Sequence, residues 1–477
     1  MSEPAIAGLG AYTPRLRVDA EVFSEALGQY EASGIEQKAV PEADEDTLTM
    51  AYEATRRALD AAGYGGGDVS YLALATTTPP MEEEDLTPRL ASMVGAPGDV
   101  TTRTLTGSTR AGGQALDAAL DAGPWNGDIA VVVASDCPRG VPDSAVEHAG
   151  GAGAGAVVLA GDGPVRVRDR ASHVETYPGT RFRPAGEERT TGLGITQYDR
   201  QAFTSTLAGA ADGLDVGEVD AAAVQSPDGK LPYRAADALG VDAAAIAAAE
   251  TVSTLGDTGA ASAFLGAVTA LADGAEAVLV AAYGSGAGAN AFVLEGDVPV
   301  DAALDGDIPV SYPEYLRRRG EITSGEPEGG GAYVSVPSWQ RTTAQRHRLV
   351  AGRCPACGAL NFPPSGACRD CTARPDEFEE LALPGTGTVE ATTTIAQGGA
   401  PPEFVEQQSR SGPFVSAVVA LAGPDGDGTV SVPTQVVTGP DEPVSVGSDV
   451  EATIRRIYQQ EGVVRYGFKM ELSESRR

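Results

Sequence analysis

The chain has 477 residues, enough for about three domains of ordinary size and for a sizeable hydrophobic core. It carries 67 acidic and 34 basic residues, a formal net charge of −33, and its only lysines are Lys38, Lys230 and Lys469. The strongly negative net charge argues against a nucleic-acid partner, because phosphate binding needs a basic stripe. The same charge predicts a surface suited to the high salt of a halophile, although an ordinary acidic bacterial protein fits the same composition.

Targeting signals are not evident in the sequence. The start, MSEPAIAGLGAY, lacks the charged and apolar regions of a signal peptide, and no run of about 18 apolar residues predicts a membrane span. Four of the five cysteines lie in one cluster with metal-ligand spacing, which suits a reducing cytosol. We therefore expect a cytoplasmic protein with no membrane partner.

The first 300 residues alternate apolar strands and amphipathic helices, which indicates an α/β domain. Gly63 follows the first of the predicted long helices and is well placed to end it. The predicted elements are the strands Ile6–Ala11, Tyr71–Ala75 and Ile129–Ala134 and the helices Thr47–Ala62 and Gly112–Ala122.

One pattern occurs twice in this region. Gly150–Leu159 (GGAGAGAVVL) and Gly284–Leu294 (GSGAGANAFVL) are Gly/Ala turns that lead into an apolar strand. Each follows an earlier apolar strand, Ile129–Ala134 in the first case and Ala277–Ala281 in the second. We interpret the repeat as a duplicated α/β half; the alternative is chance recurrence in a chain with 60 glycines.

The character of the sequence changes after Val300. Tyr312–Gly320 is predicted to form a short basic helix, and Gly325–Gly331 a linker. From Gly385 onward, β-favouring segments separated by Gly, Pro and Asp predict a small closed barrel of the OB type. The predicted barrel strands are Thr388–Ile395, Phe414–Leu421, Thr429–Val437, Asp449–Ile457 and Val463–Leu472. The predicted divisions are 1–300, a helix and linker at 301–331, a zinc ribbon at 332–384 and the barrel at 385–477.

The cysteine cluster consists of two Cys-x-x-Cys turns, Cys354 with Cys357 and Cys368 with Cys371. Together the turns offer the four thiolates of a tetrahedral zinc site. The ten residues between the pairs are typical of a zinc ribbon, whereas two redox dithiols are the alternative. A site closed by four thiolates leaves no position for substrate, so we expect the zinc to be structural.

Several motifs together resemble a known combination of domains. In the first 300 residues they are Ile6–Pro14 (IAGLGAYTP), Lys38–Pro41, Asp44–Met50, Gly153–Ala156, Pro227–Pro232 (PDGKLP) and Tyr283–Ala287. Further along they are Tyr315–Arg319, the four cysteines, Phe362–Pro364 and Tyr466–Lys469. The first set resembles archaeal 3-hydroxy-3-methylglutaryl-CoA synthase, a thiolase-superfamily enzyme, and the second the zinc-ribbon/OB domain that accompanies archaeal thiolases and synthases. The resemblance implies a duplicated five-layered thiolase fold, followed by the ribbon and the barrel.

The catalytic residues of that family do not match this chain. Such enzymes take an acyl group from CoA onto a Cys, assisted by a His and a Glu, because a thiolate both attacks and leaves well. The resemblance places Thr109 at the Cys position and Gln225 at the His position, finds no Glu at Thr76–Thr78, and puts Asp257 where the family has Asn. Thr without a base is a poor nucleophile and Gln cannot shuttle protons, so no catalytic residues are expected.

We therefore expect a non-catalytic, synthase-like subunit that scaffolds an acyl-CoA enzyme. The resemblance implies a homodimer through the first domain, a ribbon–barrel module that docks a separate thiolase, and CoA or acyl-CoA as a ligand. Lys230, kept in the PDGKLP motif, is the candidate for a CoA phosphate contact; a solvated surface lysine is the alternative.

Two other functions stay open at this point. One is an active condensing enzyme, such as a 3-hydroxy-3-methylglutaryl-CoA synthase, with a relocated catalytic set. Cys137 is the only cysteine outside the ribbon and is predicted to be a small buried residue, and His148, its conceivable partner, is expected in a loop. The other is nucleic-acid binding through the barrel, which the charge and the lack of a row of stacking aromatic residues oppose.

Overall fold

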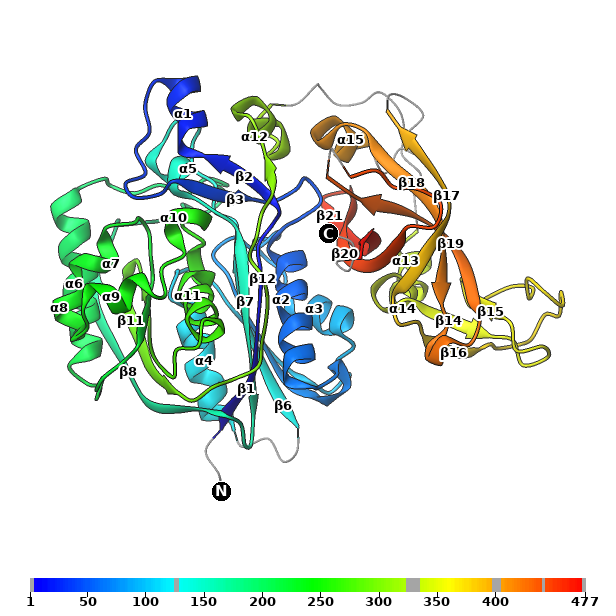
Figure 1. Cartoon of the computed structure of the whole chain (residues 1–477), viewed down its shortest axis with the longest axis horizontal. Coiled ribbons are helices and arrows are strands. Elements are labelled where there is room, and N and C mark those ends of the chain that lie inside the picture. The colour runs from blue at the N-terminus through cyan, green and yellow to red at the C-terminus, as the bar shows by residue number, and fades with distance from the viewer. Residues whose placement is uncertain (1–3, 124–127, 323–334, 397–404, 440–441, 474–477) are drawn as a thin grey trace. The chain divides into compact units, whose positions relative to one another are not determined.

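The computed structural model describes residues 4–123, 128–322, 335–396, 405–439 and 442–473. The chain divides into two compact units, Met1–Tyr315 and Leu316–Arg477 (Figure 1). The predicted linker at Gly325–Gly331 lies outside the described residues. Within the described part, no helix is both long and apolar enough to cross a membrane.

The strands of the first unit are β1 (Ala5–Tyr12), β4 (Val69–Ala75), β5 (Thr101–Leu105), β6 (Ile129–Asp136), β7 (Gly153–Ala160), β8 (Val165–Tyr177), β9 (Ala221–Val224), β10 (Ala277–Gly284), β11 (Gly286–Glu295) and β12 (Val300–Ala303), with β2 (Leu16–Asp19), β3 (Gln37–Val40) and β13 (Ile308–Pro309) in a small separate sheet. The main order is β5-β4-β6-β7-β1-β8-β11-β10-β9, with β12 against β1. β1 meets β8 only at Ala5 and Ile6, so this order contains two sheets joined at one corner.

The two halves of the main order repeat one topology. β7 is antiparallel to β1 and β6, and β6 is parallel to β4. In the same way β11 is antiparallel to β8 and β10, and β10 is parallel to β9. The repeated Gly/Ala motifs lie at β7 and β11, the equivalent strands of the two halves, so the predicted duplication is confirmed.

The long helices of this unit are α2 (Thr47–Ala62), α3 (Thr87–Val94), α4 (Ala111–Ala122), α6 (Thr196–Ala211) and α11 (Ser262–Ala272). α2 and α3 cover the first sheet and α6 covers the second. α4 and α11 each contact strands of both sheets and form the middle layer (Figure 1). This α-β-α-β-α order confirms the five-layered fold.

Local sequence explains the position of α2. Asp46 caps its start by accepting hydrogen bonds from the N–H groups of Leu48 and Thr49, and Gly63 ends it with φ 72°. A Cβ on Gly10 of β1 would lie 2.3 Å from the Ala54 carbonyl oxygen, so the close contact of helix and strand requires glycine there.

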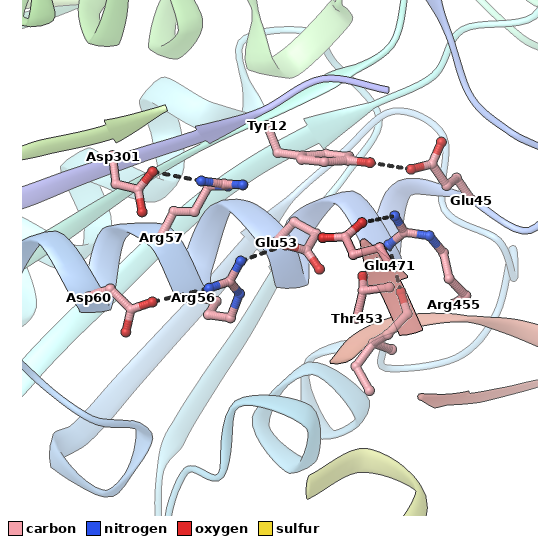
Figure 2. Close-up of polar contacts among 11 residues, drawn as sticks. Tyr12, Glu45, Glu53, Arg56, Arg57, Asp60, Asp301, Thr453, Arg455 and Glu471 are labelled. Atoms are coloured by element: carbon pink, nitrogen blue, oxygen red, sulfur yellow. Dashed lines mark hydrogen bonds and ion pairs between the residues drawn. The ribbon is translucent and has the colours of Figure 1, made fainter. Parts of the chain in front are cut away.

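Polar contacts fix both ends of this helix. Arg57 pairs with Asp301 of β12 at 2.7 Å, and Tyr12 of β1 donates to Glu45 just before the helix (Figure 2). Arg57 is buried, so its pair is better shielded from solvent than an ordinary surface ion pair.

The shorter helical elements are α1 (Ala20–Leu27), η1 (Gly66–Asp68), α5 (Ala145–Ala149), α7 (Leu231–Arg234), α8 (Ala236–Leu239), α9 (Ala243–Ala247), α10 (Val252–Leu255), η2 (Gly259–Ala261), α12 (Tyr312–Arg318), α13 (Val336–Arg341), α14 (Thr343–Arg348), α15 (Val405–Ser411) and η4 (Pro424–Gly426). α12 confirms the short basic helix predicted after Val300.

The second unit contains the ribbon and the barrel. β14 (Val350–Arg353), β15 (Leu360–Asn361) and β16 (Glu379–Ala382) form the ribbon sheet. The barrel strands are β17 (Thr386–Ile395), β18 (Phe414–Ala422), β19 (Thr429–Val437), β20 (Asp449–Gln460) and β21 (Val463–Leu472), closed in the order β17-β18-β19-β21-β20. Apolar side chains from alternate positions, such as Val430 and Val432, fill its interior. The five predicted strands are confirmed, three of them slightly longer than expected.

Candidate functional site

The first candidate site lies where the middle-layer helices begin. Thr109 lies two residues before α4, and a Cβ on Gly112 in the first turn of α4 would lie 2.8 Å from the carbonyl oxygen of Ala260 in η2. Asp257 precedes η2, and its Oδ1 accepts from the N–H of Gly259 at 3.0 Å. The starts of α4 and η2 are therefore in close contact.

Gln225 reaches the same region from β9. Its N–H donates to the Ala281 carbonyl of β10 at 2.8 Å. The next residue, Ser226, donates its N–H to the hydroxyl of Ser262 at the start of α11 at 3.0 Å. Thr109 and Asp257 therefore lie just before α4 and η2, and Gln225 lies next to the residue that contacts the start of α11.

The side chain of Thr109 is buried and hydrogen-bonded within the fold. It is 5% exposed, and its hydroxyl donates to the Tyr283 carbonyl of β10 at 2.8 Å. A Cβ on the next residue, Gly284, would lie only 1.9 Å from Ser108 Oγ, so the turn before α4 presses on the end of β10. The hydroxyl proton of Thr109 is therefore already engaged in a hydrogen bond to the Tyr283 carbonyl.

Several buried polar atoms near these helix starts have no hydrogen-bond partner within the described residues. They are Ser108 Oγ, Gln225 Oε1, Thr258 Oγ1 and Asn290 Oδ1. Buried polar atoms are rarely left unpaired in folded proteins. Such atoms are typical of a place where water or a polar ligand binds.

A hairpin, which we call the flap (residues 178–195), is fastened to this site. Phe182 and Thr191 exchange both backbone hydrogen bonds across it, at 2.8 and 2.9 Å. Arg181 forms an ion pair with Asp257, whose side chain is 5% exposed. Arg183 donates to the carbonyl of Thr77 at 2.7 Å. Two flap arginines therefore hold it against the loops of the site.

The loop expected to lack a catalytic Glu is organised around an aspartate that sequence reasoning missed. Asp136 is fully buried at the end of β6 and accepts hydrogen bonds from Thr76, Thr77 and Thr78, through three hydroxyl and two N–H groups, at 2.7–3.0 Å. It also accepts from the N–H of Ala260 at 2.6 Å. An acid closing the apolar strand IAVVVASD was the available signal. Its oxygens are fully used in joining the two halves.

Two expectations about side chains near this site need correction. Cys137 is half-buried rather than buried, with its Sγ 3.7 Å from Thr47 Oγ1 and 3.8 Å from Thr78 Oγ1. The prediction that His148 lies in a loop is wrong, because Ser144 caps a short helix, α5, that contains it. His148 is fully buried and stacks on Tyr30 at 5.3 Å.

A buried cluster around Lys38 was also missed. Lys38 is 1% exposed, donates to the Glu147 carbonyl, and lies 4.7 and 4.4 Å from the ring centroids of Phe23 and Tyr315. Burial lowers the pKa of His148, and the nearby charge of Lys38 lowers it further. The cluster fixes α12, which supplies Tyr315, to the first unit.

The predicted metal ligands are brought together in the ribbon. The Sγ atoms of Cys354, Cys357, Cys368 and Cys371 all lie within 4.8 Å of one another. Asn361 donates to the sulfur of Cys368 at 3.7 Å. Backbone N–H groups, first that of Cys371, lower the pKa of Cys368 to about 6, which favours the thiolate. Four sulfurs at this spacing fit a single tetrahedral zinc ion.

Lys230 lies on the surface, after β9. Its side chain is exposed, and its N–H donates to Asp228 Oδ1 at 2.7 Å. The same carboxylate accepts from Leu231 at 2.8 Å, which shapes the turn into α7. The role of Lys230 in binding a CoA phosphate stays a prediction.

Comparison with known proteins agrees with this geometry. Residues 341–377 match the ChsH2 rubredoxin-like zinc ribbon domain, and residues 380–455 match the ChsH2 C-terminal OB-fold domain. Among solved structures, MvaS in complex with 3-hydroxy-3-methylglutaryl coenzyme A is similar, with a TM-score of 0.59 and 20% identity, covering 69% of this chain and 94% of the other. An HMG-CoA synthase complexed with CoA also gives 0.59, at 16% identity, covering 70% and 95%.

Relatives are similar over about two thirds of this chain. The hydroxymethylglutaryl-CoA synthase of Pyrobaculum aerophilum is 27% identical over 347 residues, 67% of this chain and 98% of the relative. That of Thermococcus gammatolerans is 30% identical over 303 residues, 61% of this chain and 85% of the relative. Together with the five-layered fold, these similarities show that the chain belongs to the hydroxymethylglutaryl-CoA synthase family and carries a ChsH2-type zinc ribbon and OB fold behind the synthase-like unit.

Proposed function

We propose that this chain is a non-catalytic, synthase-like subunit that holds an acyl-CoA within a thiolase/synthase assembly. The observation that carries the proposal is the state of Thr109. The position at which the family needs a thiolate holds a buried hydroxyl that already donates to the Tyr283 carbonyl. Such a group is neither ionised nor free to attack a thioester.

Other groups do not replace the missing base. Gln225 cannot accept and release a proton at neutral pH. All three histidines of the chain are described, and their side chains lie elsewhere: His148 stacks on Tyr30, His173 lies on β8 against Gly209 of α6, and His347 belongs to the second unit. Both carboxylate oxygens of Asp136 already accept hydrogen bonds within the fold, so Asp136 does not supply the missing base. The simultaneous loss of several members of one catalytic unit favours lost chemistry over altered chemistry.

Support for retained acyl-CoA binding comes from two directions. Buried polar atoms without partners remain at the helix starts, among them Ser108 Oγ and Asn290 Oδ1. Two similar solved structures are complexes with coenzyme A or its hydroxymethylglutaryl thioester. A ligand that pairs with these atoms would remove their desolvation cost.

The assembly role rests on the two-unit design. The ribbon and barrel form a compact unit whose zinc site is closed by four cysteines, so this unit is best explained as an interaction module that docks a separate thiolase. β5 (Thr101–Leu105) ends the strand order of the first unit and pairs only with β4 among the described strands. Such an edge is suited to pairing with a second copy in a homodimer.

Intact-mass measurement after incubation with acetyl-CoA tests the proposal. The wild-type chain should bind acetyl-CoA reversibly in calorimetry and form no acetyl adduct. The double variant Thr109→Cys with Gln225→His restores a thiol and a base. It should gain one acetyl group, as the new sulfur–carbon bond forms and CoA leaves as the thiol.

The Thr109→Cys single variant is the matched control, because it adds a thiol without a base; both variants are compared in a Cys137→Ser background. It should acetylate much more slowly than the double variant. An adduct on the wild-type chain would reject the proposal.

The second candidate is an active condensing enzyme that uses Cys137. Its half-buried Sγ near the hydroxyls of Thr47 and Thr78 is the observation in its favour. A wild-type adduct that maps to Cys137 and disappears in Cys137→Ser would select this alternative.

A further inference from the structure

Charge is distributed unequally between the two units. Met1–Tyr315 carries 47 acidic and 18 basic residues, whereas Leu316–Arg477 carries 20 acidic and 16 basic residues. Within the second unit, residues 335–353 contain four arginines, one histidine and no acidic residue. This stretch covers α13, α14 and β14 and is the most basic local feature of an acidic chain.

One arginine of this stretch and one from the barrel stack on the same aromatic ring. The guanidinium carbon of Arg346, on α14, lies 4.0 Å from the ring centroid of Trp339, and that of Arg465, on β21, lies 5.2 Å from the same centroid. Tyr458 packs edge-on against Trp339 at 5.8 Å. Because both distances share one centroid, the two guanidinium carbons are at most about 9 Å apart.

These two cations have no anionic partner within the described residues. No described carboxylate forms an ion pair with either arginine, and the buried Nε–H of Arg465 has no hydrogen-bond acceptor among the described residues. Burial lowers the pKa of Arg346; Tyr458 opposes this shift, and the nearby Arg465 adds to it. Arg353, at the end of the same stretch, differs because it pairs with Asp427 at 3.2 Å. Like charges held close together in a partly desolvated place are costly unless an anion joins them.

We infer that Arg346 and Arg465 form a binding site for a phosphate group on the ribbon–barrel unit. Guanidinium groups bind phosphate oxygens through charge-assisted, often bidentate hydrogen bonds. Protein docking is less well supported, because a docking surface usually presents exposed aromatic residues and Trp339 is only 8% exposed under the arginines. The two arginines offer positive charge rather than apolar surface. The inferred phosphate site does not depend on the proposed role of Thr109.

Fluorescence titration tests the site directly. The chain has two tryptophans, so Trp125→Phe leaves Trp339 as the sole indole reporter. Inorganic phosphate, added at constant ionic strength, should change the Trp339 emission saturably. Arg346→Gln and Arg465→Gln should each weaken phosphate binding about tenfold, since a charge-assisted hydrogen bond contributes on the order of 1.5–3 kcal/mol. Phosphorus NMR line broadening provides a second measurement that does not rely on emission.

The matched control is Arg353→Gln, which removes an arginine that already has a carboxylate partner. It should leave phosphate affinity unchanged, and zinc content and circular dichroism should show that all variants fold. Titration with adenosine 3′,5′-bisphosphate distinguishes a nucleotide-borne phosphate, which should bind more tightly than inorganic phosphate, from a free one. No saturable response in either measurement, or an equal loss in Arg353→Gln, would overturn the site.

Discussion

The guanidinium of Arg181 forms an ion pair with the carboxylate of Asp257, at the position where the resemblance to the synthases places an Asn. The Asp257 side chain is 5% exposed, so the charge would be costly without its partner. Arg181 belongs to the flap, and Asp257 also accepts the N–H of Gly259 at the start of η2. The pair therefore joins the flap to the floor of the substituted site.

Breaking this pair should loosen the flap. Asp257→Asn leaves the Arg181 guanidinium, itself 18% exposed, without its carboxylate and should lower the free energy of unfolding by about 2 kcal/mol. Amide hydrogen exchange across residues 178–195 should become faster. The double variant with Arg181→Gln should recover most of the loss, because neither charge then remains unpaired. Equal destabilisation in the single and double variants would show that the pair is not coupled.

The sequence predicted the architecture better than it predicted the site. Strand and helix positions follow from local apolar patterns, and the duplicated Gly/Ala turns identified the two halves. The pairing of Arg181 with Asp257 joins residues 76 positions apart, and Asp136 binds a loop about 60 residues away, so no local pattern contains either contact. Cys-x-x-Cys spacing, in contrast, is a local signal, which explains why the metal ligands were found from sequence alone.

Zinc should be structural and confined to the ribbon. About one zinc per chain is expected from a single site of four thiolates. Cys357→Ser should lose the metal and unfold the ribbon, because binding of a structural zinc is coupled to folding. Metal analysis of the purified variants measures this directly. Cys137→Ser, which removes the only cysteine outside the ribbon, is the control and should keep its zinc; full loading in Cys357→Ser would contradict the assignment.

Acid should destabilise the first unit through His148. Its folded-state pKa is lowered by burial and by Lys38, whereas nearby Asp143 and Glu31 oppose this shift. Below pH about 6.5 the unfolded chain binds a proton that the folded chain does not, so stability falls with falling pH until the lowered pKa is passed. The maximum slope is about 1.4 kcal/mol per pH unit.

His148→Gln keeps an acceptor for the N–H of Glu31, which donates to His148 at 3.0 Å, and removes the titrating ring. Denaturant unfolding between pH about 5 and 7 should then show a shallower slope. His173→Gln removes an imidazole outside this cluster and is the control. An unchanged slope in His148→Gln would contradict the assignment.

The first unit should need α12 to be stable. Tyr315 stacks on Lys38, and Tyr312 packs on Phe23 at 5.3 Å, so both belong to the first unit although they follow the synthase-like strands. A chain that ends at residue 322 should melt like the first unit of the full protein. A chain that ends at residue 311 loses both rings and should melt several degrees lower, because about 2–4 kcal/mol of aromatic burial disappears. Equal melting temperatures would show that the cluster is not an anchor.

The ribbon–barrel unit should be required for capture of the proposed thiolase partner. We expect the chain that ends at residue 322 to remain a dimer in sedimentation, because the edge strand β5 and the Lys38 cluster are intact. With the thiolase of the same organism as prey, the full chain should recover it and the truncated chain should not. Cys357→Ser in the full chain tests the same contact by unfolding only the ribbon, and Cys137→Ser is its folded control. If the truncated dimer still recovers the thiolase at full yield, the synthase-like unit makes the contact, and the ribbon–barrel unit must act through its own ligand.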